Sequence, residues 1–309
     1  MKKISVVTPC FNEEANVEAL YDKVKEIFRK SGAYEYEHIF IDNASTDATQ
    51  TVLKKLAAAD GNVKVIINTR NFGWIRSQFY GLIQGRGDAV IMLVADFQDP
   101  PELINDFLRE WEAGYKVVLG IKTNSGESGL MFAIRKLYYN IVDNLSEVRI
   151  NKNNTGFGLY DREVIAQMQK LEEPYPFFRG LVCEFGYETA KVEYFQPARK
   201  RGITKNNFYV LYDAGMLGII NHSKVPLRLA IFSGAALAGI NLAVAFGYFV
   251  YKLIYWDSFS VGIAPAVIGL FFFSSVQLIF LGVIGEYIGA IYTQTLKRPL
   301  VIEKERINF

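Results

Sequence analysis

Residues 4–14 read Ile-Ser-Val-Val-Thr-Pro-Cys-Phe-Asn-Glu-Glu, so a short β-branched run is followed at once by a polar turn. This pattern predicts a buried strand over Ile4–Thr8. Behind a polar start at Asn12, apolar residues then recur at helical spacing between Val17 and Phe28, which predicts a helix. A strand that passes directly into an amphipathic helix is typical of an α/β sheet.

The same alternation of strands and helices continues to about residue 121. Helices are predicted from Thr46 or Asp47 to Ala59 and over Glu102–Ala113, with Pro100 and Pro101 at the start of the second. Alternation of this kind predicts a largely parallel sheet with helices on its faces. The further strands are predicted at His38–Ile41, Val63–Ile67, Ala89–Val94 and Lys116–Gly120.

The last third of the chain contains two long stretches without charge. No Asp, Glu, Lys or Arg occurs in Ala230–Tyr251 or in Val261–Gly285, and each reaches the roughly 20 residues needed to cross a bilayer. We therefore predict two transmembrane helices, at about 228–252 and 260–286. A pair of buried core helices is the alternative, although soluble core helices seldom stay charge-free for so long. Close packing, within one chain or in a homo-oligomer, is favoured by the small residues Gly234, Ala235, Ala238 and Gly239.

These features divide the chain into four parts. We expect a catalytic domain over 1–205, the two spans within 225–295, and a cytoplasmic tail over 296–309. Segment 206–224 carries apolar residues at roughly helical spacing, which fits an interfacial membrane helix or a helix docked on the catalytic domain. Basic residues flank the outer ends of both spans, so both termini are expected in the cytoplasm. Within the first part we also expect a helix over Phe132–Asn144 and a loop over Asn151–Gly158.

Composition narrows the classes of function. The 309 residues carry a formal net charge of +2 and no dense basic stripe, so nothing suggests a nucleic-acid partner. Two distant cysteines and two histidines suggest neither a disulfide framework nor a zinc site. The apolar N-terminal stretch breaks at Pro9, too early for a signal-peptide core, so the first domain is expected to stay in the cytosol.

Polar residues follow each of the first four predicted strands, in segments 8–14, 42–47, 69–73 and 95–102. Ligands of open α/β sheets bind beyond the carboxyl ends of the strands. Asp42 can accept hydrogen bonds from ribose hydroxyls or a base N–H, and Asp96 can hold a divalent ion against a diphosphate. Each residue alone also fits a turn or cap, but four such clusters in strand order favour a nucleotide site.

In this order the clusters resemble glycosyltransferase family 2, and within it the branch that uses polyprenyl-phosphate acceptors. The resemblance covers essentially the whole chain and implies a GT-A fold, which is Rossmann-like with a mostly parallel sheet, followed by the two spans. Three elements carry it: Pro9-x-Phe11-Asn-Glu, Asp42-Asn-Ala-Ser-x-Asp and Arg70-Asn-x-Gly. The donor-nucleotide residues that it implies are Pro9, Phe11, Glu13, Asp42, Asn43, Ser45, Asn71, Gly73 and Ala95.

The family's metal motif, Asp-Ala-Asp-Leu-Gln-Asp-Pro-Pro, stands here as Val-Ala-Asp-Phe-Gln-Asp-Pro-Pro from Val94. Because Val94 cannot ligate a metal, the resemblance leaves Asp96 and Gln98 as protein ligands of Mg²⁺ or Mn²⁺. It also implies that Asp96 is catalytic. The family's Asp-x-Gly-Asp-Phe-Arg region lacks both acids at 154–159, so no role is carried over there.

A basic cluster before the first span, Arg199-x-x-Gly-x-Thr-Lys205, resembles the family's Arg-x-x-Gly-x-Ser-Lys element. The resemblance implies that it binds the acceptor phosphate and that Arg199 is catalytic; the cluster alone also fits a plain electrostatic anchor to anionic membrane lipid. The phosphate- and acceptor-binding residues implied are Lys122, Arg135, Arg199, Arg201 and Lys205.

The expected activity is inverting, metal-dependent transfer of a sugar from a nucleotide-sugar to undecaprenyl or another polyprenyl phosphate at the cytoplasmic membrane face. UDP-glucose is the preferred donor, because the two-span arrangement resembles bacterial glucosyl-lipid enzymes; GDP-mannose, UDP-galactose and aminosugar donors stay open. A processive polysaccharide synthase is an alternative, but the chain has no Gln-x-x-Arg-Trp element. A weakly catalytic nucleotide-sugar-binding scaffold is another, because Val94 replaces an acid.

Overall fold

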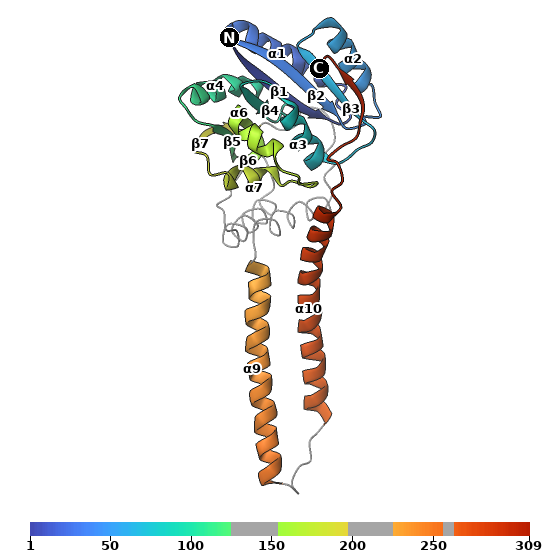
Figure 1. Cartoon of the computed structure of the whole chain (residues 1–309), viewed down its shortest axis with the longest axis vertical. Helices are drawn as coiled ribbons and strands as arrows, with labels where there is room; N and C mark the ends of the chain where they lie inside the picture. The colour runs from blue at the N-terminus through green and yellow to red at the C-terminus, as the bar shows by residue number, and fades with distance from the viewer. Residues whose placement is uncertain (125–153, 197–224, 256–262) are drawn as a thin grey trace.

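The computed structural model describes residues 1–124, 154–196, 225–255 and 263–309 (Figure 1). The predicted helix Phe132–Asn144 and the segment 206–224 lie outside these ranges. In the catalytic part the elements follow in the order β1 (Lys2–Cys10), α1 (Val17–Ser31), β2 (Tyr34–Asp42), α2 (Thr49–Ala59), β3 (Val63–Asn68), α3 (Trp74–Gln84), β4 (Ala89–Met92), the 3₁₀ turn η1 (Pro101–Leu103), α4 (Ile104–Glu112), β5 (Val117–Asn124), β6 (Asn154–Asp161), α6 (Arg162–Gln169), α7 (Phe178–Glu184) and β7 (Thr189–Phe195). Two long helices, α9 (Val225–Ile254) and α10 (Ile263–Thr295), precede a last strand, β8 (Glu303–Ile307).

One eight-stranded sheet, in the order β7-β5-β6-β4-β1-β2-β3-β8, forms the centre of the catalytic part. Strand β1 runs parallel to β2 and β4, β2 runs parallel to β3, and β5 runs parallel to β7. Only β6 and β8 run antiparallel to their neighbours. The predicted α/β fold with a mostly parallel sheet is confirmed.

Helices cover both faces of the sheet (Figure 1). One core layer packs α1, α2 and α4 against the sheet through residues such as Leu20, Leu53 and Phe107. The other packs α3, α6 and α7 through Phe79, Ile165 and Leu181. The apolar positions predicted for α1 are buried, because their helical spacing places them on one stripe facing the sheet.

The predicted loop Asn151–Gly158 is wrong from Asn154 onward, since Asn154–Asp161 forms β6 between β4 and β5. The glycines of this segment give it the composition of a loop. In the structure, however, Gly158 lets β6 pack closely against β5. A Cβ at Gly158 would lie 2.4 Å from the carbonyl oxygen of Val118. Glycine in a strand often marks such a close backbone approach.

The C-terminal segment returns to the catalytic sheet, which the prediction of a simple tail over 296–309 did not anticipate. Strand β8 pairs antiparallel with β3. Ahead of it, the Thr69 N–H donates to the Ile302 carbonyl oxygen at 2.9 Å. Beyond it, Asn308 Nδ2 donates to the carbonyl oxygens of Ala57 and Val63 at 2.7 and 2.9 Å. The end of the chain is thus fixed to the sheet on both sides of β8.

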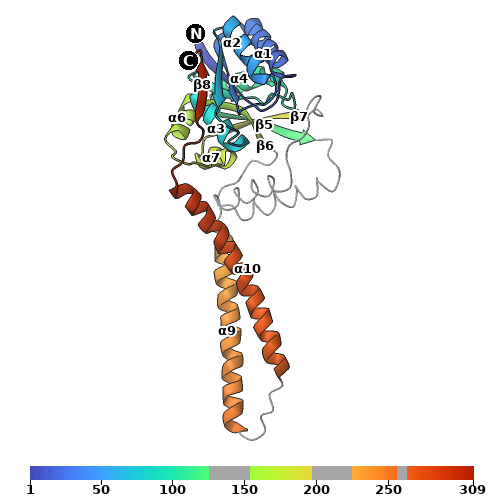
Figure 2. The same ribbon diagram turned by 90° about the vertical axis from the view of Figure 1, so that its right-hand side faces the viewer.

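Helices α9 and α10 extend away from the catalytic part as a stalk. Both termini of the chain lie on the catalytic part, at the end away from the stalk (Figures 1 and 2). At about 1.5 Å per residue the helices are roughly 45 and 50 Å long. Among the described residues, the segment Phe272–Thr295, with a mean hydropathy of 1.5, is long and apolar enough to cross a membrane, and its apolar window is not buried in the protein. Val225–Ile240 is a shorter apolar helical segment.

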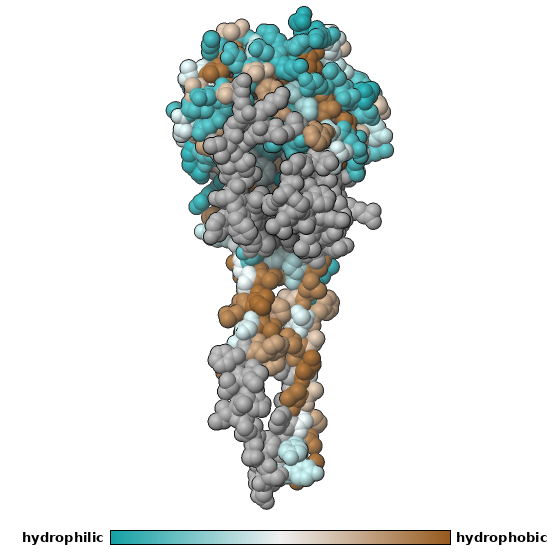
Figure 3. Space-filling model, turned by 180° about the vertical axis from the view of Figure 1, so that it is seen from behind, coloured by the Kyte–Doolittle hydropathy of each residue, from teal (hydrophilic) through white to brown (hydrophobic). Residues whose placement is uncertain are grey.

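The two predicted spans therefore have different standing. Length and composition support a candidate span within α10, and that helix continues to Thr295 rather than ending near residue 286. The other predicted span, at about 228–252 in α9, stays a prediction. Figure 3 shows the hydrophobic surface of the stalk against the more hydrophilic catalytic part. Gly234 of α9 faces α10, since a Cβ there would lie 3.9 Å from the Phe280 ring.

Candidate active site

The carboxyl ends of β1, β2, β3 and β4 bring the four predicted polar segments to one end of the sheet. Cys10 at the end of β1 is in register with Asp42 at the end of β2, and Asp42 with Ile67 of β3. Just beyond, the Asn43 N–H donates to the Cys10 carbonyl oxygen at 2.9 Å. The segments predicted to bind one ligand thus start from adjacent points.

Of the predicted donor residues, Pro9 lies within β1, while Phe11 and Glu13 lie in the segment that follows it. That segment is held by the segment after β2. The Asn12 N–H donates to Ser45 Oγ, and the Thr46 N–H donates to Asn12 Oδ1, both at 2.8 Å. Asn12 and Ala44 have φ values of 57° and 61°, in the left-handed region. A left-handed conformation costs alanine roughly 1–2 kcal/mol, because its Cβ comes close to the following carbonyl oxygen.

Asp42 is fully buried beneath this turn. Its Oδ2 accepts from the Ser45 N–H at 3.0 Å and from Gln50 Nε2 at 2.9 Å. Its Oδ1 is buried without a hydrogen-bond partner. Burial raises the pKa of Asp42, and the nearby charge of Asp47 adds to the effect. Asp42 therefore both holds the turn and retains one unsatisfied acceptor.

An amide network joins the segment after β2 to the segment after β3. Asn43 Nδ2 donates to Asn71 Oδ1 at 2.8 Å, and Asn43 Oδ1 accepts from Asn68 Nδ2 and from the Phe72 N–H at 3.1 and 3.0 Å. Asn71 Oδ1 also accepts from the Gly73 N–H at 2.8 Å. Gly73, with a φ of 86°, is the N-cap of α3. Two predicted donor residues, Asn71 and Gly73, are thereby placed beside Asn43.

The turn after β4 carries Asp96 and Gln98, which lie on either side of Phe97 with its left-handed φ of 58°. The Gln98 N–H donates to Asp96 Oδ1 at 3.1 Å, and Asp96 is 8% exposed. Ala95, just before it, is buried. The turn is therefore locally closed, with Asp96 near the surface of the site.

Asp99 follows this turn and is sealed from solvent, with 2% exposure. Its Oδ1 accepts from the Tyr194 hydroxyl at 2.6 Å. Burial raises the pKa of Asp99 to about 7, although the bond from Tyr194 and the charge of Lys122 lower it. Lys122, a predicted phosphate-binding cation on β5, is in register with Tyr194 of β7, the residue that bonds Asp99.

The oxygen donors of this turn fit a hard divalent cation only in part. Among the described residues, no three or more His, Cys, Asp or Glu side chains gather closely enough to hold a metal. Asp96 and Gln98 supply the carboxylate and amide oxygens that Mg²⁺ and Mn²⁺ accept. The residues therefore fit an ion that takes its remaining ligands from a bound diphosphate and water.

Four predicted phosphate- and acceptor-binding residues, Arg135, Arg199, Arg201 and Lys205, lie outside the described residues. Sequence reasoning missed Gln50, Asn68 and Tyr194 as members of the site. Gln50 lies in the first turn of α2, and its place just beyond a strand end was a usable signal. Tyr194 had no such signal, because 95 residues separate it from Asp99.

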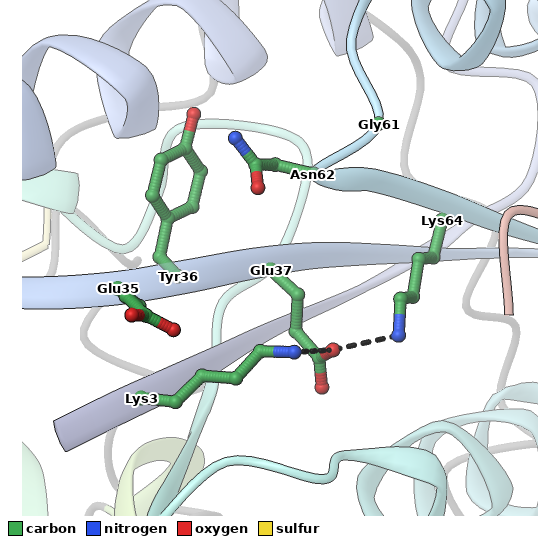
Figure 4. A pocket seen from close by; sticks show the side chains of 7 residues that line it. All are labelled: Lys3, Glu35, Tyr36, Glu37, Gly61, Asn62 and Lys64. Carbon is green, nitrogen blue, oxygen red and sulfur yellow. Dashed lines mark ion pairs between the residues drawn. The ribbon is translucent and has the colours of Figure 1, made fainter. Parts of the chain in front are cut away.

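A cavity of about 300 Å³ lies at the opposite end of the strands (Figure 4). Within it, Glu37 Oε2 lies 2.8 Å from Lys3 Nζ and 2.7 Å from Lys64 Nζ. One carboxylate thus pairs with two ammonium groups at the amino ends of β1, β2 and β3. We therefore assign this cluster to stability rather than to ligand binding.

Comparison with known proteins agrees with this arrangement. Residues 5–167 match the model of glycosyl transferase family 2. The bactoprenol glucosyl transferase of Shigella phage SfV is 35% identical over 303 residues, covering 98% of each chain. The uncharacterized glycosyltransferase YkcC of Bacillus subtilis is 33% identical over 299 residues, covering 96% of this chain and 92% of that one.

Among solved structures, glucosyl-3-phosphoglycerate synthase of Mycobacterium tuberculosis, in complex with Mn²⁺, UDP and phosphoglyceric acid, is 18% identical. The match covers 71% of this chain and 76% of that one, with a TM-score of 0.45. A likeness this distant supports no inference about the present chain.

Proposed function

This chain belongs to glycosyl transferase family 2, and on that premise we propose that it transfers glucose from UDP-glucose to a polyprenyl phosphate at a membrane. The relatives that are named bactoprenol glucosyl transferases match nearly its whole length. The observation that carries the proposal is the joining of three polar strand-end segments by the Asn12–Ser45 and Asn43–Asn71 hydrogen bonds. The fourth segment, which carries Asp96, follows β4, the neighbour of β1 in the sheet.

For the donor, we place the nucleoside at the ends of β1, β2 and β3. Asp42 Oδ1 is an acceptor without a partner, and a buried unsatisfied acceptor costs about 1–3 kcal/mol. A base N–H or ribose hydroxyl is the donor it lacks, once Ser45 and Gln50 move aside. Pro9, Phe11 and Glu13 would border the nucleoside from β1, and Asn71 and Gly73 from β3.

For the diphosphate, we propose that Asp96 and Gln98 hold Mg²⁺ or Mn²⁺. The ion would neutralise charge on the leaving diphosphate. Lys122, whose charge acts on the same turn, would supply a second positive charge from the protein. Such charge stabilisation is the largest contribution that a protein usually makes to reactions of this kind.

For the acceptor, we propose direct displacement with inversion. A phosphate oxygen of the lipid forms a bond to the anomeric carbon of glucose, and the bond from that carbon to the UDP oxygen breaks. The acceptor needs no strong base, because the second pKa of a phosphate monoester is about 6 and it is already largely ionised at neutral pH. Alignment of the two substrates is then the main task of the protein. The residues proposed for acceptor binding are Arg135, Arg199, Arg201 and Lys205.

For topology, we propose that α9 and α10 both cross the membrane and that the catalytic part faces the cytoplasm. Because β8 pairs with β3, the chain before α9 and the chain after α10 lie on one side of the bilayer. An even number of crossings must therefore separate them. If α10 crosses, α9 must cross as well. Basic residues at the outer ends of the two helices, Arg228 in the first turn of α9 and Arg298 just after α10, favour the cytoplasm for that side.

The test is transfer of radiolabel into an organic-extractable product from purified full-length protein, undecaprenyl phosphate and Mg²⁺ or Mn²⁺. UDP-glucose, UDP-galactose and GDP-mannose are compared, with EDTA as a control. We expect labelling from UDP-glucose alone, lost in EDTA.

Two variants sharpen the test. Asp96→Asn should lower the rate by about 100-fold or more, because it removes the anionic metal ligand. Asp106→Asn is the matched control, since Asp106 pairs only with Arg109 on the surface of α4, at 2.8 Å. No labelling from any donor, with nucleotide binding intact, would favour the scaffold function instead.

A further inference from the structure

Asp99 and Tyr194 form a buried contact beside the turn that carries Asp96 and Gln98. The Tyr194 hydroxyl donates to Asp99 Oδ1 at 2.6 Å, and the two residues are 2% and 6% exposed. The proposed function uses neither side chain. A hydrogen bond between a phenol and a carboxyl group is strong when both are shielded from water.

The turn needs support from outside itself. Phe97 adopts a left-handed φ of 58°, and such strain of about 1–3 kcal/mol persists only where the surroundings fix the backbone. Within the turn, the Gln98 N–H donates to Asp96 Oδ1 at 3.1 Å. Pro100 and Pro101 follow and have no N–H to donate. The side chain of Asp99 is therefore a principal anchor of the turn on its C-terminal side.

Tyr194 is well placed to supply that anchor. It lies on β7 in register with Lys122 of β5, and its carbonyl oxygen accepts from Thr123 Oγ1 at 3.1 Å. Its ring packs edge-on against Phe157 of β6, with centroids 5.6 Å apart. Three strands thus fix the position of the hydroxyl.

We propose that Tyr194 is a positioning residue for the metal-binding turn. Its hydroxyl holds Asp99, and Asp99 keeps Asp96 and Gln98 directed at the donor diphosphate. The inference rests on the proposed function, in which those two residues hold the ion. In this proposal Tyr194 acts through Asp99, so removing its hydroxyl should loosen the turn although both ligand side chains remain in the protein.

The test compares Tyr194→Phe with Tyr160→Phe in the full-length protein in detergent. Tyr160 is the control, because its hydroxyl is also buried and donates to the Gly156 carbonyl oxygen at 3.0 Å, whereas the Tyr194 hydroxyl contacts Thr155 Oγ1 at 3.4 Å besides Asp99. Mn²⁺ binding in the presence of UDP is measured by electron paramagnetic resonance, alongside the thermal unfolding midpoint. Tyr194→Phe should weaken Mn²⁺ binding by about 10-fold, as the loss of a partner behind a metal ligand typically does. Tyr160→Phe should lower the unfolding midpoint with Mn²⁺ binding unchanged.

Two substitutions of Asp99, the acceptor of the Tyr194 hydrogen bond, give a second measurement. Asp99→Asn keeps an oxygen that can accept from Tyr194 and should retain Mn²⁺ binding, whereas Asp99→Ala should resemble Tyr194→Phe. Equal Mn²⁺ affinity in wild type and Tyr194→Phe would overturn this inference alone. A wild-type protein that binds no Mn²⁺ with UDP would overturn the proposed metal site, and this inference with it.

Discussion

Replacing Glu37 by glutamine should destabilise the catalytic part by about 3 kcal/mol at pH 7. Glu37 is 1% exposed and lies between Lys3 and Lys64 (Figure 4). Its Oε1 accepts from Ser5 Oγ at 2.6 Å and from the Arg86 N–H at 2.9 Å. Glutamine preserves the shape but removes the charge that both ammonium groups face.

The size of the effect follows from the pKa. Burial alone would raise the pKa of Glu37, but Lys3, Lys64 and the two hydrogen-bond donors lower it from 4.5 to about 2. A pKa lowered by about 2.5 corresponds to roughly 3 kcal/mol, at about 1.4 kcal/mol per unit. Because the folded-state pKa is lowered, the ionised carboxylate contributes its full stabilisation at pH values above 4.5. This stabilisation is lost as the pH falls toward 2. About 1 kcal/mol of the difference should therefore be gone at pH 4.

Urea unfolding of the full-length protein in detergent, followed by tryptophan fluorescence, measures this difference. Trp111 is a suitable probe in the catalytic part, because it is 8% exposed and its indole N–H donates to Asp161. Glu35→Gln is the matched control, since Glu35 borders the same cavity but is exposed; it should change stability by less than about 0.5 kcal/mol. Equal stability of the two variants at pH 7 would refute the reasoning, as would a Glu37→Gln deficit that does not shrink at pH 4.

Two further perturbations test the fold. Gly158→Ala should cost about 1–3 kcal/mol by overpacking, because its Cβ would meet the Val118 carbonyl oxygen at 2.4 Å. Gly61→Ala is the control, because a Cβ there would have nothing within 4 Å, and it should leave the unfolding midpoint unchanged. Equal unfolding midpoints for Gly158→Ala and Gly61→Ala would contradict the packing argument. Ending the chain after Val301 removes β8 and should lower that midpoint and increase proteolysis of the catalytic part, whereas unchanged protease resistance would show that β8 contributes little.

The first half of the fold was predictable because each element has a strong local pattern. Helices α1, α2 and α4 have one apolar stripe, and the first four strands are β-branched runs that end in polar segments. Helix α3 was not predicted, since its N-cap Gly73 offers no capping side chain and Gly81 interrupts the helical pattern. Gly81 is needed there, because a Cβ would lie 2.8 Å from Val7 Cγ1 of β1. Tertiary packing, rather than helix propensity, determines that segment.

The residues missed in the site depend on contacts between distant parts of the chain. The pattern of strands followed by polar segments placed Asp42, Asn71 and Asp96 near strand ends, where the structure has them; their roles stay predictions. The bond between Asp99 and Tyr194 depends on the order of β7, β5, β6 and β4 in the sheet, which no local pattern contains. Strand β8 was missed for a similar reason, since its alternation of charged and apolar residues is short and typical of an exposed edge.

The pairing of β8 with β3 also has a consequence for biosynthesis. The ribosome makes β8 after every other element, so the sheet is completed only when α9 and α10 have already been synthesised. Until then the β3 edge is open, and open edges invite aggregation. If α9 and α10 both cross the membrane as proposed, a copy in which only one of them inserts would leave β8 across the membrane from β3. Completion of the sheet thereby reports correct insertion, and misinserted copies would remain distinguishable to cellular proteases by their unfinished edge.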